Sequence, residues 1–146
     1  MRDFLSKLLK MKQNDSIIRQ SIGIDVSKNQ FKAAFGVLIN TAQFKVLSSK
    51  SFNNTDKGIN DFLSWMNNWL EKKGDKSQAL GITMEPTGVY HENLAYTLYE
   101  KDYQVHLVLP NLANKFAESL GLKSKSDPLD AKSLARMGAE RELRLW

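Results

Sequence analysis

The sequence predicts an α/β fold, a mixed five-stranded sheet with helices on both faces. Two observations support this prediction. Three apolar segments, at 21–25, 31–39 and 43–51, follow one another with only short polar turns between them, which is typical of an antiparallel meander. After them, segments with helical periodicity alternate with short apolar segments. A mixed sheet accommodates both patterns, because its parallel strands need helical crossovers that cover its faces.

The first half of the chain holds the meander and one long helix. The first strand ends at an acid, Asp25, and the second strand alternates before a turn at Asn40-Thr41. Residues 53–56 then offer N-cap side chains. Beyond them apolar residues recur at helical spacing until Gly74, so we expect an amphipathic helix. The apolar stripe of this helix comprises Ile59, Phe62, Leu63, Met66, Trp69 and Leu70.

The second half of the chain alternates strands with helices. It predicts strands at 79–84 and 103–109, and helices at 90–101, 111–120 and 129–137. Residues that disfavour continuation stand at the ends of these elements, since proline lacks the backbone donor and glycine favours turns. These residues are Pro86, Pro110, Gly121 and Gly138.

The composition excludes several classes of protein. The chain has 146 residues, 42% of them hydrophobic, which is enough apolar material for the core of one domain. It contains no cysteine, which excludes disulfides, thiolate nucleophiles and Cys-type zinc sites. Two histidines, His91 and His106, are too few for a His-rich metal site. No apolar run approaches the roughly 20 residues of a membrane helix, and no secretory signal is recognisable, so we expect a cytoplasmic protein without membrane contact.

The charge points only weakly to a partner. The formal net charge is +5, and a basic balance is typical of proteins that bind polyanions. The imbalance is concentrated in residues 1–20, where five basic residues stand against two acidic ones. We interpret these residues as a basic N-terminal extension that precedes a domain at 21–146. Charge alone is as compatible with a solvated surface as with a nucleic-acid partner.

Four acidic residues stand where strands end or a helix begins. Asp25 and Glu85 close the first and fourth strands, and Asp127 and Asp130 open the last helix, three positions apart on one helical face. If the first and fourth strands are neighbours, these carboxylates meet at the carboxyl end of the sheet. Converging carboxylates repel one another unless a cation joins them, and hard divalent ions such as Mg²⁺ take oxygen ligands. Two such ions can support phosphodiester transfer.

Each acid also has a simpler structural interpretation. Asp127 before Pro128 could be the N-cap of the last helix, with Asp130 in its acidic first turn. Asp25 could form an Asx turn with Ser27, and the acid after the fourth strand could be an ordinary surface residue. The placement of all four at element ends favours a shared site, but spacing alone leaves the function open.

Three motifs in the chain resemble those of a known family. They are Gly23-Ile24-Asp25-Val26-Ser27-Lys28, Met84-Glu85-Pro86-Thr87-Gly88-Val89-Tyr90-His91 and Lys125-Ser126-Asp127-Pro128-Leu129-Asp130-Ala131. In this order they resemble the N-terminal RuvC-like DEDD domain of bacterial insertion-sequence transposases, a family that includes the Piv invertase. The resemblance covers roughly residues 21–140 and implies a ribonuclease H-like fold. Ser126 stands where the family usually has threonine, which keeps a hydroxyl group at this position.

The resemblance implies a function and a set of roles. Asp25, Glu85, Asp127 and Asp130 match the family's catalytic acids, which hold Mg²⁺ or Mn²⁺ for cleaving and rejoining DNA strands. The resemblance also implies a C-terminal domain with a nucleophilic serine beyond Trp146 and an element-encoded guide RNA, and we expect the full-length protein to form a homo-oligomer. The isolated domain is expected to be inactive or only partly active.

Basic residues near the acids are candidates for contact with nucleic acid. They are Lys28, Lys123, Lys125, Lys132 and Arg136. Phosphate contacts of this kind supply attraction that does not depend on base sequence. The simpler interpretation is a solvated loop before a capped helix.

Two other functional classes remain open. The first is a non-catalytic nucleic-acid-binding module, which would not need a divalent ion at the four acids. The second is half of an actin-like or sugar-kinase ATPase, which also begins with a strand and an Asp. Its phosphate loop needs a glycine where this chain has Ser27, and the chain is short for two lobes, so this class is disfavoured.

Overall fold

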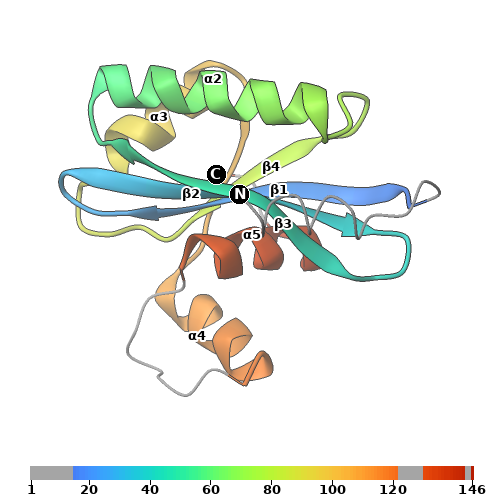
Figure 1. The fold of residues 1–146 in the computed structure, drawn as a ribbon. Coiled ribbons are helices and arrows are strands. Elements are labelled where there is room, and N and C mark those ends of the chain that lie inside the picture. The colour runs from blue at the N-terminus through green and yellow to red at the C-terminus, as the bar shows by residue number, and fades with distance from the viewer. Residues whose placement is uncertain (1–14, 122–129, 144–145) are drawn as a thin grey trace.

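A mixed sheet forms the centre of the molecule (Figure 1), in a computed structural model that describes residues 15–121, 130–143 and 146. The five strands have the order β3-β2-β1-β4-β5. They are β1 (Ile17–Val26), β2 (Gln30–Ile39), β3 (Phe44–Asn53), β4 (Leu80–Met84) and β5 (Gln104–Leu107). The helices of the described part are α2 (Asp56–Lys72), α3 (Glu92–Glu100), α4 (Pro110–Ser119) and α5 (Ala131–Glu140). The predicted order of elements is confirmed.

Strand directions follow from the length of the connections. Short turns join β1 to β2 and β2 to β3, and both pairs are antiparallel. β4 returns through α2 to lie parallel to β1, and β5 returns through α3 to lie parallel to β4. Helical crossovers of this kind are what parallel neighbours require. The carboxyl ends of β1 and β4 therefore lie at the same edge of the sheet.

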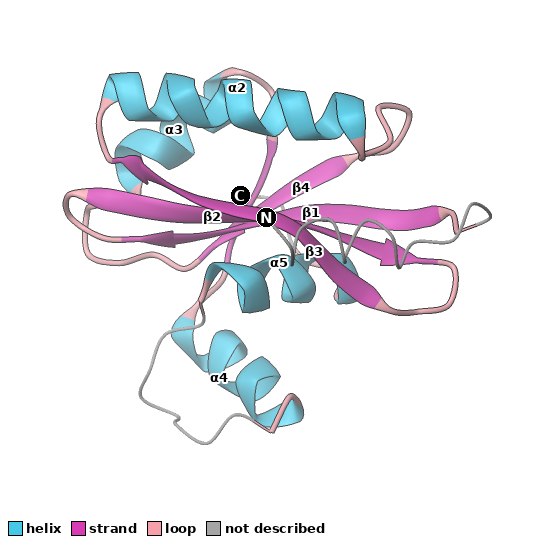
Figure 2. Cartoon of the chain, in the orientation of Figure 1, coloured by secondary structure: helices cyan, strands magenta, loops and turns pink. Residues whose placement is uncertain are grey.

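Helices cover both faces of the sheet (Figure 2). α2 and α3 lie on one face, α5 lies on the other, and α4 lies outside α5. α4 joins α5 through a small apolar cluster that includes Phe116, Leu134 and Met137. The predicted fold class, a mixed five-stranded sheet with helices on both faces, is confirmed.

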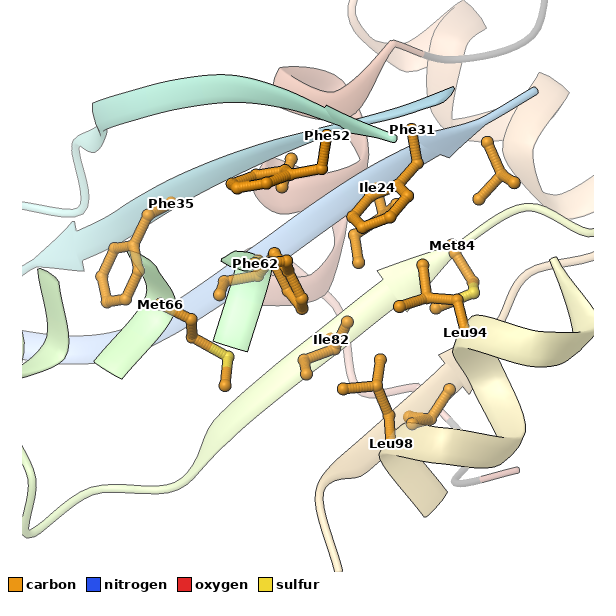
Figure 3. Close-up of a cluster of buried hydrophobic side chains, with 14 of the residues drawn as sticks. Ile24, Phe31, Phe35, Phe52, Phe62, Met66, Ile82, Met84, Leu94 and Leu98 are labelled. Atoms are coloured by element: carbon orange, nitrogen blue, oxygen red, sulfur yellow. The ribbon is translucent and has the colours of Figure 1, made fainter. Parts of the chain in front are cut away.

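The larger core lies between the sheet and the helices α2 and α3 (Figure 3). The rings of Phe31, Phe52 and Phe62 pack with centroids 5.5 to 5.6 Å apart. Trp65, which falls outside the apolar stripe of α2, packs beside them with its ring centroid 5.7 Å from that of Phe52. Burying each of the phenylalanine side chains contributes about 1.5–3 kcal/mol. These aromatic residues therefore act as core, which the helical spacing predicts for Phe62.

α5 packs closely on the other face of the sheet because glycine residues at the contact leave no side chain between the helix and the strands. A Cβ atom built on Gly23 of β1 would collide with backbone atoms of Ala131 and Ala135. Further along the helix, a Cβ on Gly138 would collide with the hydroxyl groups of Ser21 and Thr83. Early residues of α5 thus lie over the later part of β1, and late residues over its earlier part. α5 runs antiparallel to β1, and its N-terminus points to the carboxyl edge of β1 and β4.

Three predicted elements have boundaries that differ from the observed ones. β1 begins at Ile17 and includes four residues of the segment we interpreted as an extension. β5 (Gln104–Leu107) is shorter than the predicted strand at 103–109. The last helix begins at Ala131 and continues through Gly138 to Glu140. Gly138 does not end the helix, because it is needed for close packing on the sheet, and this tertiary contact outweighs its poor helix propensity.

No helix within the described ranges is long and apolar enough to span a membrane.

Candidate metal and nucleic-acid site

Asp25 and Glu85 lie at the carboxyl ends of neighbouring parallel strands, Asp25 one residue before the end of β1 and Glu85 directly after β4. Ile24 of β1 pairs with Met84 of β4, and each acid is the next residue along its strand direction. Ile24 and Met84 are buried in the core under α2 and α3. Because successive side chains alternate between the faces, both acids point to the opposite face, the one that α5 covers. Adjacent strands lie about 4.8 Å apart, so the two residues are neighbours across the sheet.

Asp130 reaches the same edge from a distant part of the sequence. It is the N-cap of α5, and its Oδ1 accepts a hydrogen bond from the backbone N–H of Ser133 at 2.8 Å. The N-cap interpretation that we considered for Asp127 therefore belongs to Asp130. Since the first turn of α5 lies over Gly23, two residues before Asp25 on the same face, the cap brings Asp130 towards Asp25.

The electrostatics of Asp25 reflect this arrangement. Solvent reaches its side chain, but partial burial raises the pKa of Asp25, and the negative charge of Asp130 raises it further. The positive charge of Lys32 lowers the pKa of Asp25 and offsets part of the rise. Two carboxylates close enough to raise a pKa favour either a proton or a cation between them.

Glu85 occupies a more sheltered position than Asp25. The residue is half-buried, and its Oε2 atom is shielded from solvent. Pro86 follows directly and favours an extended backbone at Glu85, which continues the direction of β4. The hydroxyl of Thr87 donates to the Glu85 carbonyl oxygen at 3.3 Å and closes the turn after it.

The structure places Asp130 close enough to Asp25 for its charge to raise the pKa of Asp25, and it places Glu85 after the strand that neighbours β1. Asp127 lies outside the described residues. Within the described ranges, no group of three or more His, Cys, Asp or Glu side chains is close enough to form a ready-made metal cage. Carboxylate oxygens are nevertheless the ligands that Mg²⁺ prefers, and Mg²⁺ commonly binds through one or two carboxylates together with water and substrate phosphate. The donor set at this edge of the sheet fits such an ion.

The predicted nucleic-acid contacts are only partly described. Lys28 is exposed in the turn between β1 and β2, at the acidic edge of the sheet. Lys132 is exposed in the first turn of α5. Arg136 is exposed one turn further along, but its Nε donates to Glu140 at 2.9 Å, so part of its charge is compensated. Lys123 and Lys125 lie outside the described residues.

Lys32 is a candidate that sequence reasoning missed. It pairs with Asp25 across the β1–β2 hairpin, and its side chain lies on the same face. It is exposed, and its positive charge acts on Asp25. A lysine beside the acids can attract a phosphate that approaches them. The available signal was the turn at 27–29, because a hairpin turn fixes which residues of its two strands face each other.

Comparison with known proteins decides the family. The family model DEDD_Tnp_IS110, described as "Transposase", matches residues 22–145. The chain belongs to this family of DEDD transposases. The resemblance inferred from the three motifs is therefore confirmed.

Two curated relatives support the assignment of this DEDD transposase domain. The "Pilin gene-inverting protein" of Moraxella bovis and that of Moraxella lacunata are each 34% identical to it over 125 residues. The match covers 86% of this chain and 36% of each relative. The chain therefore spans about a third of the length of these curated relatives.

Solved structures show a likeness in outline. RuvC from Thermus thermophilus is 12% identical, with a TM-score of 0.45, over 80% of this chain and 90% of that chain. The same protein in complex with a Holliday junction substrate is 14% identical, with a TM-score of 0.45, over 83% of this chain and 97% of that chain. Family membership, together with three antiparallel strands followed by two parallel ones, agrees with the ribonuclease H-like class that the motifs implied.

Proposed function

We propose that this DEDD transposase domain is the metal-dependent part of an enzyme that cleaves and rejoins DNA strands. The observation that carries the proposal is the proximity of Asp25 and Asp130. They are far apart in the sequence, but in the fold they are close enough for the charge of Asp130 to raise the pKa of Asp25. Like charges held together cost stability, and a functional site is the usual reason for retaining them.

The chain's own residues have distinct roles in this proposal. Asp25 and Glu85 present carboxylate oxygens from rigid strand ends, and Asp130 presents Oδ2 while its Oδ1 caps α5. Asp127 completes the set by family resemblance. One or two Mg²⁺ or Mn²⁺ ions bound there would activate a nucleophile and stabilise the leaving oxygen.

DNA is the substrate that family membership favours. The acids repel a phosphate backbone, so positive charge at their rim is needed to attract it. Lys28, Lys32 and Lys132 supply such charge within the described residues, and Lys123 and Lys125 would add to it. The guide RNA, the homo-oligomer and the cytoplasmic location stay predictions that the motifs and composition suggest.

A manganese titration tests the site directly. We expect Mn²⁺ to broaden the amide NMR signals of Val26, Glu85 and Ala131 before those of other residues, because these amides surround the acids. Binding should be weak without DNA, since Mg²⁺-type sites borrow ligands from substrate phosphate. Asp130→Asn keeps a capping side chain but removes the charge, so it should reduce the broadening while α5 stays folded.

Two further variants complete the titration. Asp127→Ala should reduce the broadening if the fourth acid joins the site. Broadening that survives in Asp130→Asn, Asp127→Ala and Asp25→Ala alike would contradict a metal site at these acids. Nucleic-acid binding that persists in all three variants without any metal dependence would favour the alternative, a non-catalytic binding module.

The salt dependence of DNA binding tests the basic rim. Each phosphate contact contributes about 0.9 to the slope of log K against log salt concentration. The double variant Lys123→Ala/Lys125→Ala should therefore flatten the slope for duplex DNA by up to about 1.8. The matched control is Lys72→Ala/Lys73→Ala at the far end of α2, which should leave the slope unchanged. An unchanged slope in the first variant would remove this loop from the interface and favour residues 1–20.

A further inference from the structure

Asn54 connects the two loops that follow the acids of the sheet. Its side-chain Nδ2 donates to the carbonyl oxygen of Ser27 at 3.1 Å and to that of Tyr90 at 2.9 Å. Ser27 lies two residues after Asp25, in the β1–β2 turn, and Tyr90 lies in the loop that begins at Glu85. One amide group therefore uses both of its hydrogens to join two loops that no strand ladder connects.

The backbone of Asn54 is itself held in place by hydrogen bonds and close packing. Its backbone N–H donates to the carbonyl oxygen of Asn29 at 2.9 Å, which gives a third bond at the same edge. Asn54 lies between the end of β3 and Thr55, the N-cap of α2, whose hydroxyl accepts from Gly58 N at 3.1 Å. Gly58 packs so closely on Asn53 that a Cβ atom there would collide with the Asn53 backbone. A side chain with so rigid an attachment can fix the groups that it binds.

The pairing of β1 with β4 makes this connection necessary. The pairing ends at Ile24 and Met84, so Asp25 and Glu85 lie just beyond the last paired residues. Asp25 stays paired with Lys32 in the β1–β2 ladder, whereas Glu85 enters the loop after β4, so no strand pairing joins the backbone of Glu85 to that of Asp25. A metal site needs its ligand oxygens held in a defined geometry by groups outside the ligand shell.

We propose that Asn54 is a positioning residue that holds Asp25 and Glu85 at the separation a divalent ion requires. This inference rests on the proposed function for its consequence in metal binding. Asn54 acts through the backbones of Ser27 and Tyr90, and its own side chain need not touch the ion.

The test compares two variants that add the same charge. Asn54→Asp is isosteric, but its carboxylate cannot donate to the Ser27 and Tyr90 carbonyl oxygens and repels both. Asn93→Asp is the control, because Asn93 Nδ2 donates to Asp56 Oδ1 at 3.1 Å on the same rim without joining the two loops. An added negative charge alone should strengthen Mn²⁺ binding. We expect Asn54→Asp to weaken it 10- to 100-fold, the range found for outer ligand partners, and Asn93→Asp not to weaken it.

Amide hydrogen exchange separates this inference from the proposed function. The amides of Ser27, Asn54 and Tyr90 donate to Gln30, Asn29 and Thr87 respectively, so they report on both loops. Exchange of all three should accelerate at least tenfold in Asn54→Asp and not in Asn93→Asp. If the unsubstituted protein fails to bind Mn²⁺, the proposed function fails, and faster exchange in both loops still supports the role of Asn54. Unchanged exchange, or unchanged Mn²⁺ affinity in a protein that binds Mn²⁺, overturns the inference.

Discussion

Replacing Gly23 by alanine is expected to destabilise the protein by about 3 kcal/mol or more. The new Cβ atom would collide with the backbone of Ala131 and Ala135 in α5. Overpacking in a well-packed core costs typically 1–3 kcal/mol, and backbone atoms of a helix cannot move aside as a flexible side chain can. The free energy of unfolding, measured by urea denaturation, checks this expectation.

A neighbouring glycine supplies the control for this substitution. Gly81 lies in β4 on the same face, but a Cβ atom there would meet only the ring of His106, at 3.2 and 3.4 Å. The ring can shift, and alanine favours the strand over glycine, so Gly81→Ala should change stability by less than about 1 kcal/mol.

Gly23→Ala should also weaken Mn²⁺ binding, because the collision would displace α5, which carries Asp130 as its N-cap. A free energy of unfolding for Gly23→Ala within about 1 kcal/mol of that of the unsubstituted protein would contradict the close packing of α5 on β1.

Replacing Asp25 by asparagine is expected to separate function from stability. Loss of an outer ligand partner costs 10- to 100-fold in metal affinity, so loss of a ligand should weaken Mn²⁺ binding by about 100-fold or more. The melting temperature of the metal-free protein should stay the same or rise, because the variant removes a charge that Asp130 repels. Calorimetry and the Mn²⁺ titration measure the two effects on the same sample.

The stability effect has a defined pH dependence. The pKa of Asp25 is raised above its ordinary value of 3.8, so the folded state binds the proton more tightly than the unfolded state. The ionised carboxylate therefore disfavours folding at neutral pH. That cost disappears as the pH falls through the raised pKa, where the carboxyl becomes protonated. Any gain from Asp25→Asn should be present at pH 7 and vanish in the acid range.

The control for Asp25 is another aspartate with a different environment. Asp61 is exposed and forms an ion pair with Lys57 at 3.1 Å. Asp61→Asn should leave Mn²⁺ binding unchanged and reduce stability by up to about 0.5 kcal/mol, as for other exposed helix pairs. A clear loss of stability in Asp25→Asn would instead indicate a structural role for Asp25.

Local patterns in the sequence were sufficient to predict the elements of this fold. The alternation around Phe31 and Phe35 predicts β2, and the spacing of Ile59, Phe62 and Met66 predicts α2. Such patterns work because one face of each element must be buried, and burial imposes a period of two on strands and of 3.6 on helices. The acid motifs were also recognisable, because each of them is a short continuous stretch of the sequence.

Element ends were less predictable, because contacts between distant segments decide them. Gly138 has poor helix propensity, and the sequence pattern therefore predicts that the last helix ends there. In the folded protein the absence of a side chain lets α5 approach Ser21 and Thr83, so the helix continues to Glu140. Asp130 likewise became the N-cap because Ala131 begins the part of the helix that packs on the sheet.

The sequence by itself determined the family, the order of the elements and the four acids as candidates. Only the tertiary structure decided that β4 pairs with β1, which makes Glu85 a neighbour of Asp25, and that α5 runs antiparallel to β1, which brings Asp130 to the same edge. It also decided that Lys32 faces Asp25 and that Asn54 joins the two loops. The physical reason is that periodicity is a local property of the chain. Strand neighbours, helix direction and side-chain bridges depend instead on which distant surfaces fit together.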